Sequence, residues 1–282
     1  MGLYPGGPPG VVAARRLLRR RERDETGRFL AEGPQAVREA LAAGAVLELF
    51  ATPAALARYP ELVAYPELVA EAGADRDRAG GMPVGRAPRL SPVTEDGLAA
   101  LAETVAPQGL VAVCATRDVP LAQALARPPR LVAVLAGIRD PGNAGTVLRT
   151  ADAAGAGAVV FAGEAVDPYN GKCVRASAGS VFHVDLVRAG EPAAVLSALR
   201  AAGLLVLAAD PYGDADLDAL ADAGELRPDT AWVFGSEAHG LPEALAAAAD
   251  RRVRVPLYGQ AESLNLAAAA AVCLYASARA LR

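Results

Sequence analysis

Apolar positions in the second half of the chain follow two alternating patterns. Short runs that are apolar at almost every position are typical of strands buried on both faces, whereas an apolar residue at every third or fourth position is typical of a helix with one buried face. Alternation of the two predicts an α/β fold, a parallel sheet with helices on both faces. The predicted strands lie at 131–138, 158–162, 182–187, 204–209, 231–234 and 253–257, and the predicted helices at 144–154, 193–202, 242–248 and 264–281.

The first half of the chain alternates in the same way and predicts a smaller α/β domain. Its predicted helices lie at 15–28, 35–43 and 98–102, the first of which is expected to end near Thr26 and Gly27. Its predicted strands lie at 29–33, 46–51 and 109–115. Residues 1–12 are rich in glycine and proline and are expected to be disordered. The six residues 59–64 recur at once as 65–70, which indicates a tolerated insertion in a surface segment rather than a repeat architecture.

These patterns divide the chain into four parts. We expect a basic, partly disordered N-terminal arm at 1–25, a small α/β domain at 26–116, a proline-containing linker at 117–130 and a larger α/β domain at 131–282. With 282 residues, of which 53% are hydrophobic and 21% charged, the chain is long enough for two domains with separate cores.

The cysteines and the apolar runs restrict the setting in which the protein works. Cys114, Cys173 and Cys273 are widely spaced and odd in number, which fits neither a disulfide framework nor a metal site. No apolar run is as long as a membrane span, and the first residues do not resemble a signal peptide. We therefore expect a cytoplasmic protein that binds neither a metal nor a membrane.

The charge is unevenly distributed along the chain. The formal net charge of −4 argues weakly against a nucleic-acid partner, yet residues 15–28 hold seven arginines against three acidic residues, a local net charge of +4. Such a segment could neutralise several phosphates of a nucleic acid, but it could equally be a solvated helix face of salt-bridged pairs. The candidate nucleic-acid contacts are Arg15, Arg16, Arg19, Arg20 and Arg28.

Three motifs with polar side chains follow predicted strands of the larger domain. In the first, Asn143 is suited to cap the helix that it opens, and Arg149 lies six residues on, so that both side chains could face one site. A cap and an unrelated surface arginine would give the same pattern. In the third motif, Ser263 could cap the last helix, and the amide of Asn265 in its first turn would be costly to bury unpaired, which favours a functional role.

The second motif is a tight turn that contains Gly235, Glu237, His239 and Gly240. Its backbone could approach a ligand closely, and a dinucleotide such as NAD is one candidate for that ligand. The turn lacks the Gly-x-Gly-x-x-Gly spacing, however, and no acidic residue follows about twenty positions later at a strand end. A nicotinamide-dependent oxidoreductase is therefore disfavoured, and His239 is interpreted as a loop histidine.

In this order, residues 140–149, 234–241 and 254–266 resemble the three signature motifs of the SpoU (TrmH) family of RNA ribose methyltransferases. The resemblance covers about residues 129–282. It implies the SPOUT fold, a parallel sheet with a C-terminal trefoil knot, and methylation of a ribose 2′-hydroxyl with S-adenosylmethionine as cofactor. It also implies two sets of site residues: Asn143, Arg149, Glu237, Ser263 and Asn265 in the active site, and Gly235, Val255, Leu257 and Leu264 around the cofactor.

The chemistry of a guanidinium limits the role that Arg149 can have. In the family, the matching arginine is often written as the general base, but a guanidinium is too weak a base at neutral pH for that role to be simple. We prefer a role in which Arg149 holds the adjacent phosphate and polarises the ribose oxygen while the proton leaves by another route.

The smaller domain is similar to the substrate-binding domain, related to ribosomal protein L30e, that precedes the catalytic domain in many SpoU enzymes. Residues 29–33 and 104–109 carry this resemblance, which favours large-subunit ribosomal RNA as the substrate; a tRNA 2′-O-methyltransferase is one alternative. A non-catalytic RNA-binding relative is the other alternative, and the complete set of active-site residues speaks against it.

The family also forms homodimers in which the arginine reaches the cofactor of the partner protomer. In the helix at 264–281, small and apolar residues stand at close-packing positions and are compatible with an interface or with a core. These residues are Ala267, Ala270, Ala271 and Leu274.

Overall fold

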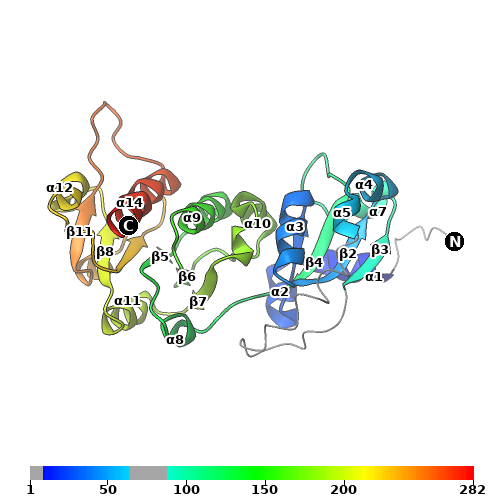
Figure 1. The fold of residues 1–282 in the computed structure, drawn as a ribbon, viewed down its shortest axis with the longest axis horizontal. Helices are drawn as coiled ribbons and strands as arrows, with labels where there is room; N and C mark the ends of the chain where they lie inside the picture. Colours follow the sequence, from blue (N-terminus) through cyan, green and yellow to red (C-terminus); the bar gives the residue numbers. More distant parts are fainter. Residues whose placement is uncertain (1–8, 64–87) are drawn as a thin grey trace. The chain divides into compact units, whose positions relative to one another are not determined.

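The computed structural model describes residues 9–63 and 88–282, which form two compact units (Figure 1). The first unit comprises the described residues up to Thr116 together with Tyr169–Phe182, and the second comprises Arg117–Pro168 and His183–Arg282. Two of the expected features lie partly or wholly outside the described residues: the disorder expected at 1–12, of which 9–12 are described, and the second copy of the six-residue repeat.

The second unit is built on a seven-stranded sheet. Its strands are β5 (Leu131–Ala136), β6 (Ala158–Ala162), β7 (Asp185–Ala189), β8 (Leu205–Ala209), β9 (Ala215–Asp216), β10 (Thr230–Phe234) and β11 (Arg251–Arg254). They lie in the order β7-β6-β5-β10-β8-β11-β9, and every neighbouring pair is parallel. The predicted parallel sheet is therefore confirmed.

Helices cover both faces of this sheet (Figure 1). They are α8 (Leu121–Ala124), α9 (Pro141–Ala153), α11 (Pro192–Ala201), α12 (Leu217–Asp222), α13 (Glu243–Ala247) and α14 (Leu266–Ala280). On one face, alternate strand residues such as Val132 and Val160 pack against α8, α11 and α13. On the other face, Trp232 is fully buried and donates its Nε1 hydrogen to the buried Ser277 Oγ of α14, at 2.8 Å.

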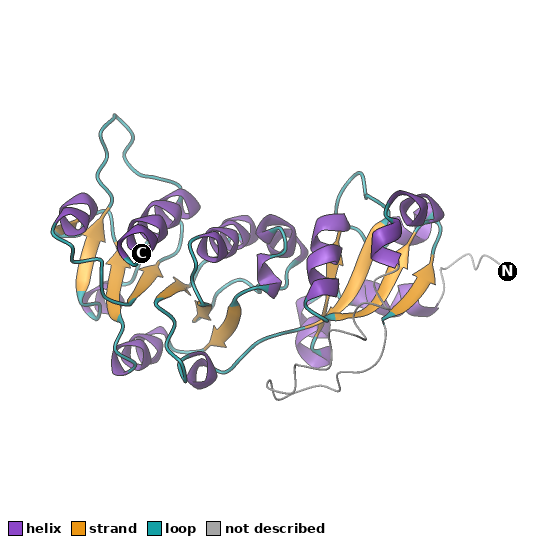
Figure 2. Ribbon diagram, in the orientation of Figure 1, coloured by secondary structure: helices purple, strands orange, loops and turns teal. Residues whose placement is uncertain are grey.

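The first unit holds a smaller, mixed sheet. Its strands are β1 (Arg28–Glu32), β2 (Val46–Ala51), β3 (Arg89–Pro92) and β4 (Leu110–Ala115), in the order β1-β4-β2-β3. β4 pairs antiparallel with both of its neighbours, and β2 pairs parallel with β3. In the described residues up to Thr116, the helices are α1 (Pro9–Arg16), α2 (Arg20–Thr26), α3 (Pro34–Ala42), α4 (Pro53–Arg58), α5 (Pro60–Val63) and α7 (Glu95–Ala99), which Figure 2 distinguishes from the strands by colour.

The N-terminal segment differs from the predicted arm. Residues 15–28 do not form one helix, because the chain turns at residues 17–19 between α1 and α2; the predicted end is right, since α2 ends at Thr26 and Gly27 adopts a left-handed φ of 62°. Val11, Ala14 and Leu17 are buried in the core of the first unit. Residues 9–25 are thus an integral layer of this unit, because their apolar face needs that core.

The predicted linker also packs closely. Asp118 forms a parallel bridge with Leu186, and the Val119 amide donates to the Leu186 carbonyl at 2.8 Å, which extends the sheet beyond β7. Ala124 of α8 is buried in the core of the second unit. Residues 118–124 therefore belong to the second unit and are not a free connection.

Residues 169–182 interrupt the larger α/β domain predicted at 131–282. They form α10 (Gly171–Ser177) and a 3-10 turn, η2 (Ser180–Phe182), and both belong to the first unit. The strand predicted at 182–187 starts only at Asp185, because Phe182 packs against Phe29 of β1 with ring centroids 5.8 Å apart. An apolar run in a sequence does not reveal which of two cores will bury it.

Candidate active site

An open cleft lies at the carboxyl ends of β5 and β10, which are neighbours in the parallel sheet. It encloses about 620 Å³ and is lined by the two loops that follow these strands. Ligands on open α/β sheets bind at this edge. The lining residues are Ala136, Gly137, Arg139 and Asp140 from the first loop, and Ser236, Glu237, Ala238, His239, Gly240 and Pro242 from the second.

The start of α9 is capped by Asp140, not by Asn143 as predicted. Asp140 has an extended backbone, and its Oδ1 accepts a hydrogen bond from the Asn143 amide at 2.8 Å, with Pro141 at the first helical position. Asn143 is thus inside the first turn. Because its side chain is not needed for the cap, its amide is available for other partners.

Glu237 accepts three hydrogen bonds across the cleft. Its carboxylate oxygens lie 3.2 Å from the Arg139 amide, 3.1 Å from the Asp140 amide and 3.1 Å from Asn143 Nδ2. Partial burial acts to raise the pKa of Glu237, but hydrogen bonds from its own backbone amide, from Asn143 and from the two loop amides together lower it below its ordinary value. Glu237 is therefore ionised at neutral pH and is a hydrogen-bond acceptor rather than an acid.

Asn265, not Ser263, is the cap of α14. Its Oδ1 accepts from the amides of Ala267 at 2.9 Å and Ala268 at 3.3 Å. Its Nδ2 donates to Asn143 Oδ1 at 3.2 Å. Ser263 is exposed in the preceding loop.

These contacts form one directed row of hydrogen bonds. The helix amides fix the oxygen of Asn265, so its nitrogen faces Asn143, and the nitrogen of Asn143 in turn faces Glu237. Both amide groups therefore have a defined orientation. The structure brings together three of the five predicted active-site residues, Asn143, Glu237 and Asn265.

Arg149 lies apart from this row. A separation of six residues turns the helix by about 600°, so two such side chains point about 120° apart. Arg149 is exposed, and within the described parts of the chain its side chain makes no hydrogen bond or ion pair. No contact joins Arg149 to Asn143 in the described residues, so the expectation that both side chains face one site stays a prediction.

Gly235 is required by the closure of its own loop. A Cβ at this position would lie 2.2 Å from the carbonyl carbon of Gly240, and Ser236 and Gly240 exchange two backbone hydrogen bonds of 3.0 and 2.9 Å. At the other side of the cleft, Gly137 has a φ of 69° and open space where a side chain would be. Gly137 and Arg139, which line the cleft, are not among the residues that the sequence motifs predicted. Their position at the end of an apolar strand could have indicated a place in the site.

The loop between β11 and α14 projects from its unit (Figure 1). It contains the other predicted cofactor contacts, Val255, Leu257 and Leu264, and none of them lines the cleft. Leu257 and Leu264 are 40% and 39% exposed. β11 itself ends at Arg254, three residues earlier than predicted.

The sequence left open whether the arginines of residues 15–28 form salt bridges or are available to a nucleic acid, and the structure contains both kinds. Arg16 and Arg20 form exposed ion pairs with Glu22 and Asp24, at 3.1 and 3.5 Å. By contrast, among the described residues no ion pair or hydrogen bond engages the side chains of Arg15, Arg19 and Arg28, all of which are exposed.

The buried Arg23 belongs to neither kind, since it donates to the carbonyl oxygens of Leu17 and Leu18 at 2.8 and 3.0 Å. It thereby fixes the turn between α1 and α2. Its guanidinium is structural and is not offered to a nucleic acid.

The described residues contain neither a metal-binding cluster nor a membrane span. In 9–63 and 88–282, no three His, Cys, Asp or Glu side chains gather where they could hold a metal ion. Within the same ranges, no helix is long and apolar enough to cross a membrane. The three cysteines are buried and free, and burial raises the pKa of Cys273 to about 12.

Comparison with known proteins decides the family. Residues 130–275 match the SpoU rRNA Methylase family. The chain belongs to this family. Residues 9–112 match the MRM3-like substrate binding domain, a range that includes α1 and agrees with its burial in the first unit.

Similar proteins span nearly the whole chain. One is the 23S rRNA (guanosine(2553)-2′-O)-methyltransferase RlmP of Bacillus subtilis, 34% identical over 93% of this chain and 92% of its own. A crystal structure of an AdoMet-bound rRNA methyltransferase from Sinorhizobium meliloti superimposes with a TM-score of 0.79, at 31% identity, over 96% of this chain and 94% of that one. The SpoU methyltransferase AviRb from Streptomyces viridochromogenes, in complex with AdoMet, gives a TM-score of 0.75 at 28% identity, covering 96% and 98%.

Proposed function

We propose that this protein methylates a ribose 2′-hydroxyl of large-subunit ribosomal RNA, with S-adenosylmethionine as the methyl donor. The observation that carries the proposal is the row Glu237–Asn143–Asn265 at the cleft between β5 and β10, in a chain that belongs to the SpoU rRNA methylase family. The names of its relatives support 23S rRNA as the substrate rather than tRNA. The complete polar row favours an enzyme over a non-catalytic relative.

The lining of the cleft suits S-adenosylmethionine. Small residues make up more than half of its lining, and the space beside Gly137 is open. A neutral adenine needs this kind of surface and no phosphate cradle, and the ionised Glu237 favours a nearby positive charge. When bound, the cofactor supplies an electrophilic methyl group on a sulfonium. The amides of Gly235 and the loop residues Val255, Leu257 and Leu264 would complete its site.

The side chains of the row prepare the ribose site. Asn143 retains one amide hydrogen and one oxygen lone pair beyond its bonds to Glu237 and Asn265, and these are available to orient a ribose hydroxyl. Glu237 acts by holding Asn143 in place. Ser263, two residues before the Asn265 cap, is assigned to the same active site. Preorganised hydrogen bonds of this kind lower the barrier because they need not reorganise during the reaction.

The position of Arg149 supports a homodimer. Arg149 does not meet the polar row of its own chain, so we assign it to the site of a second copy, where it holds the RNA phosphate and polarises the ribose oxygen. The predicted contact residues Ala267, Ala270 and Leu274 are buried within the protomer and are core. The opposite face of α14 is exposed, with Val272 at 43% and Tyr275 at 52%, and is the surface we assign to the partner.

The remaining assignments concern the fold and the RNA. We assign the loop 255–265 to a trefoil knot of the SPOUT type and the first unit to an L30e-like RNA-binding role. The side chains of Arg15, Arg19 and Arg28, together with Arg16 and Arg20, are the proposed phosphate contacts. Since its substrate would be ribosomal RNA, the protein would act in the cytoplasm, without a metal ion.

A cofactor-binding and transfer assay tests this function. S-adenosylhomocysteine should bind in the presence of a chelator, and a labelled methyl group should pass from S-adenosylmethionine to 23S rRNA but not to tRNA. Mapping of the methylated ribose, with Asn143→Ala as the inactive control, identifies the product. Absence of both binding and transfer at about millimolar ligand would overturn the proposal.

A further inference from the structure

The first unit includes a segment that the chain contributes only after leaving the second unit. This returning segment, Tyr169–Phe182, lies inside the range that matches the SpoU rRNA Methylase family, yet it folds with the residues that match the substrate binding domain. The chain therefore passes between the two units three times, after Thr116, after Pro168 and after Phe182.

An aromatic cluster buries the returning segment on β1. Phe29 is fully buried, and the Tyr169 and Phe182 rings lie 4.5 and 5.8 Å from it between centroids. Aromatic pairs at these distances stabilise beyond the area that they bury. Both ends of the segment are thus anchored on one ring of the substrate-binding unit.

Close packing fixes the segment between its ends. A Cβ at Gly179 would lie 2.3 Å from Glu39 Cγ of α3, and Gly179 has a φ of 102°. Ala178, just before it, adopts a left-handed φ of 49° and is the one non-glycine residue with a positive φ in the described chain. A conformation that costs an alanine free energy persists only where the surrounding structure holds it.

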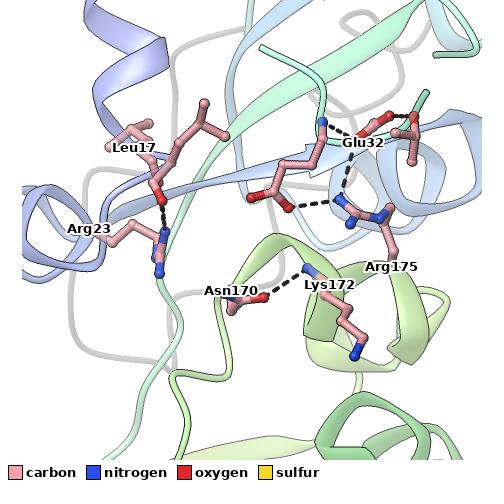
Figure 3. Close-up of polar contacts among 9 residues, drawn as sticks. Leu17, Arg23, Glu32, Asn170, Lys172 and Arg175 are labelled. Carbon is pink, nitrogen blue, oxygen red and sulfur yellow. Dashed lines mark hydrogen bonds and ion pairs between the residues drawn. The ribbon is translucent and has the colours of Figure 1, made fainter. Parts of the chain in front are cut away.

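One arginine joins the segment to two acidic side chains. Figure 3 shows Arg175 of α10 pointing at Glu32 of β1, and its Nη1 lies 3.4 Å from Glu32 and 3.0 Å from Glu103. The Glu32 side chain is only 9% exposed, and it also accepts hydrogen bonds from the Glu103 amide, at 3.1 Å, and from the Thr104 hydroxyl. Removal of Arg175 would leave a mostly buried carboxylate without its counter-charge, which is costly.

We propose that Arg175 is a positioning residue for methyl transfer. By holding the returning segment on the substrate-binding unit, it keeps three chain passages between the units instead of one. With the passage at Arg117 alone, the two units could turn about that short connection, because Thr116 is bonded in the first unit and Asp118 in the second. The two additional passages reduce this freedom, so that RNA held by the first unit meets the cleft of the second more often. The role in methyl transfer rests on the proposed function. The structural half of the inference, that the returning segment is held on the first unit, does not depend on that function.

Kinetics of the full-length protein test the role of Arg175. In Arg175→Ala, the single-turnover rate at saturating ribosomal RNA should fall about tenfold or more, because the loss acts on presentation of the RNA. Affinities for RNA and for S-adenosylhomocysteine should stay within about twofold of wild type. Arg175→Lys should restore much of the rate, since both carboxylates are reached from one nitrogen. Arg38→Ala, which breaks the exposed Arg38–Glu61 pair of the same unit, is the matched control and should leave the rate unchanged.

Two kinetic outcomes would overturn the proposal. A wild-type rate in Arg175→Ala would remove the residue from the reaction. A weaker RNA affinity with an unchanged rate at saturation would mean that Arg175 contacts the RNA directly.

Native-state hydrogen exchange on the wild-type chain gives an independent measurement, even where Arg175→Ala does not fold. The amides of α10 should open together with those of β1 and β4, at the same free energy and denaturant dependence. Opening together with β6 and β7, the neighbours of the segment in sequence, would overturn the structural half. Absence of RNA methylation by wild type would defeat the proposed function alone, because the exchange result does not depend on it.

Discussion

Glu237→Gln offers a direct measurement of the polar row. Glutamine keeps the size of the side chain but replaces one acceptor oxygen by an NH₂ group. At least one of the N–H donors of Arg139, Asp140 and Asn143 then faces another donor and lacks an acceptor. Hydrogen bonds to a charged group contribute about 1.5–3 kcal/mol each, and exposure to solvent reduces this value. Glu237 is exposed, so we expect a total loss of about 1–2 kcal/mol, or about 2–8 °C in the melting temperature of the second unit.

The stability difference between wild type and Glu237→Gln should depend on pH. The pKa of Glu237 is lowered in the folded protein, so its contribution is present above the ordinary pKa of a glutamate and disappears as the pH falls through the folded value. The difference between wild type and Glu237→Gln should therefore shrink as the pH falls from about 7 to about 3, in thermal or urea unfolding followed by circular dichroism.

A variant of the same charge change serves as the control. Glu243→Gln removes a carboxylate that is 77% exposed and pairs with Arg252 of β11, so its effect at neutral pH should be much smaller. Equal stability of wild type and Glu237→Gln at neutral pH would refute the account. So would a deficit that persists undiminished in acid, because a protonated glutamate resembles glutamine.

The other predictions concern catalysis and RNA binding. Arg149→Ala should abolish methyl transfer in a single-turnover assay and leave the calorimetric affinity for S-adenosylhomocysteine intact; a wild-type rate would exclude it from the mechanism. Asn265→Asp keeps the cap of α14 but replaces the donor that faces Asn143, so its unfolding free energy should change by about 0.5 kcal/mol or less while the rate falls; loss of both together would mean a purely structural role. Replacement of Arg15 and Arg19 by glutamine should lower the slope of log affinity against log salt for RNA by about 1.4–1.8, and parallel salt series would show that neither meets a phosphate.

Sequence periodicity identifies strands and helices better than it identifies caps. β2 and β6 begin and end at the predicted residues. β6 is an apolar run between Gly157 and Gly163, and β2 starts shortly after Gly44 and ends before Thr52, so the flanking residues leave little choice. The caps were wrong at both active-site helices. Each predicted cap stands within three residues of another side chain that can cap a helix: Asp140 lies near Asn143, and Asn265 lies near Ser263. Only the three-dimensional path of the chain decides which of the two caps the helix.

Elements without an apolar pattern were missed for a related reason. β9 and α12 lie in a stretch with five aspartates between residues 210 and 222, which gives no helical or strand periodicity. The membership of residues 169–182 in the first unit could not be predicted either. Its buried residues, such as Tyr169 and Val174, would suit either core, and the contacts that decide between the cores join residues more than sixty positions apart.

The residue types that make helix caps hard to predict are also the ones that form the active-site row. A helix start presents amide hydrogens that need an acceptor, and Asp, Asn and Ser are the side chains that supply it. At α14, Asn265 uses its oxygen for the helix and its nitrogen for Asn143, so one residue both ends the loop and orients the site. At α9, Asp140 takes the cap, which leaves Asn143 to link Asn265 to Glu237. A helix cap alone would accept aspartate or serine at position 265, and the helix needs no cap from position 143. The directed row, by contrast, requires an amide at both positions, with an acceptor on one side and a donor on the other. Aspartate or serine would satisfy the helices and break the row, and this requirement separates the candidate site from ordinary helix capping.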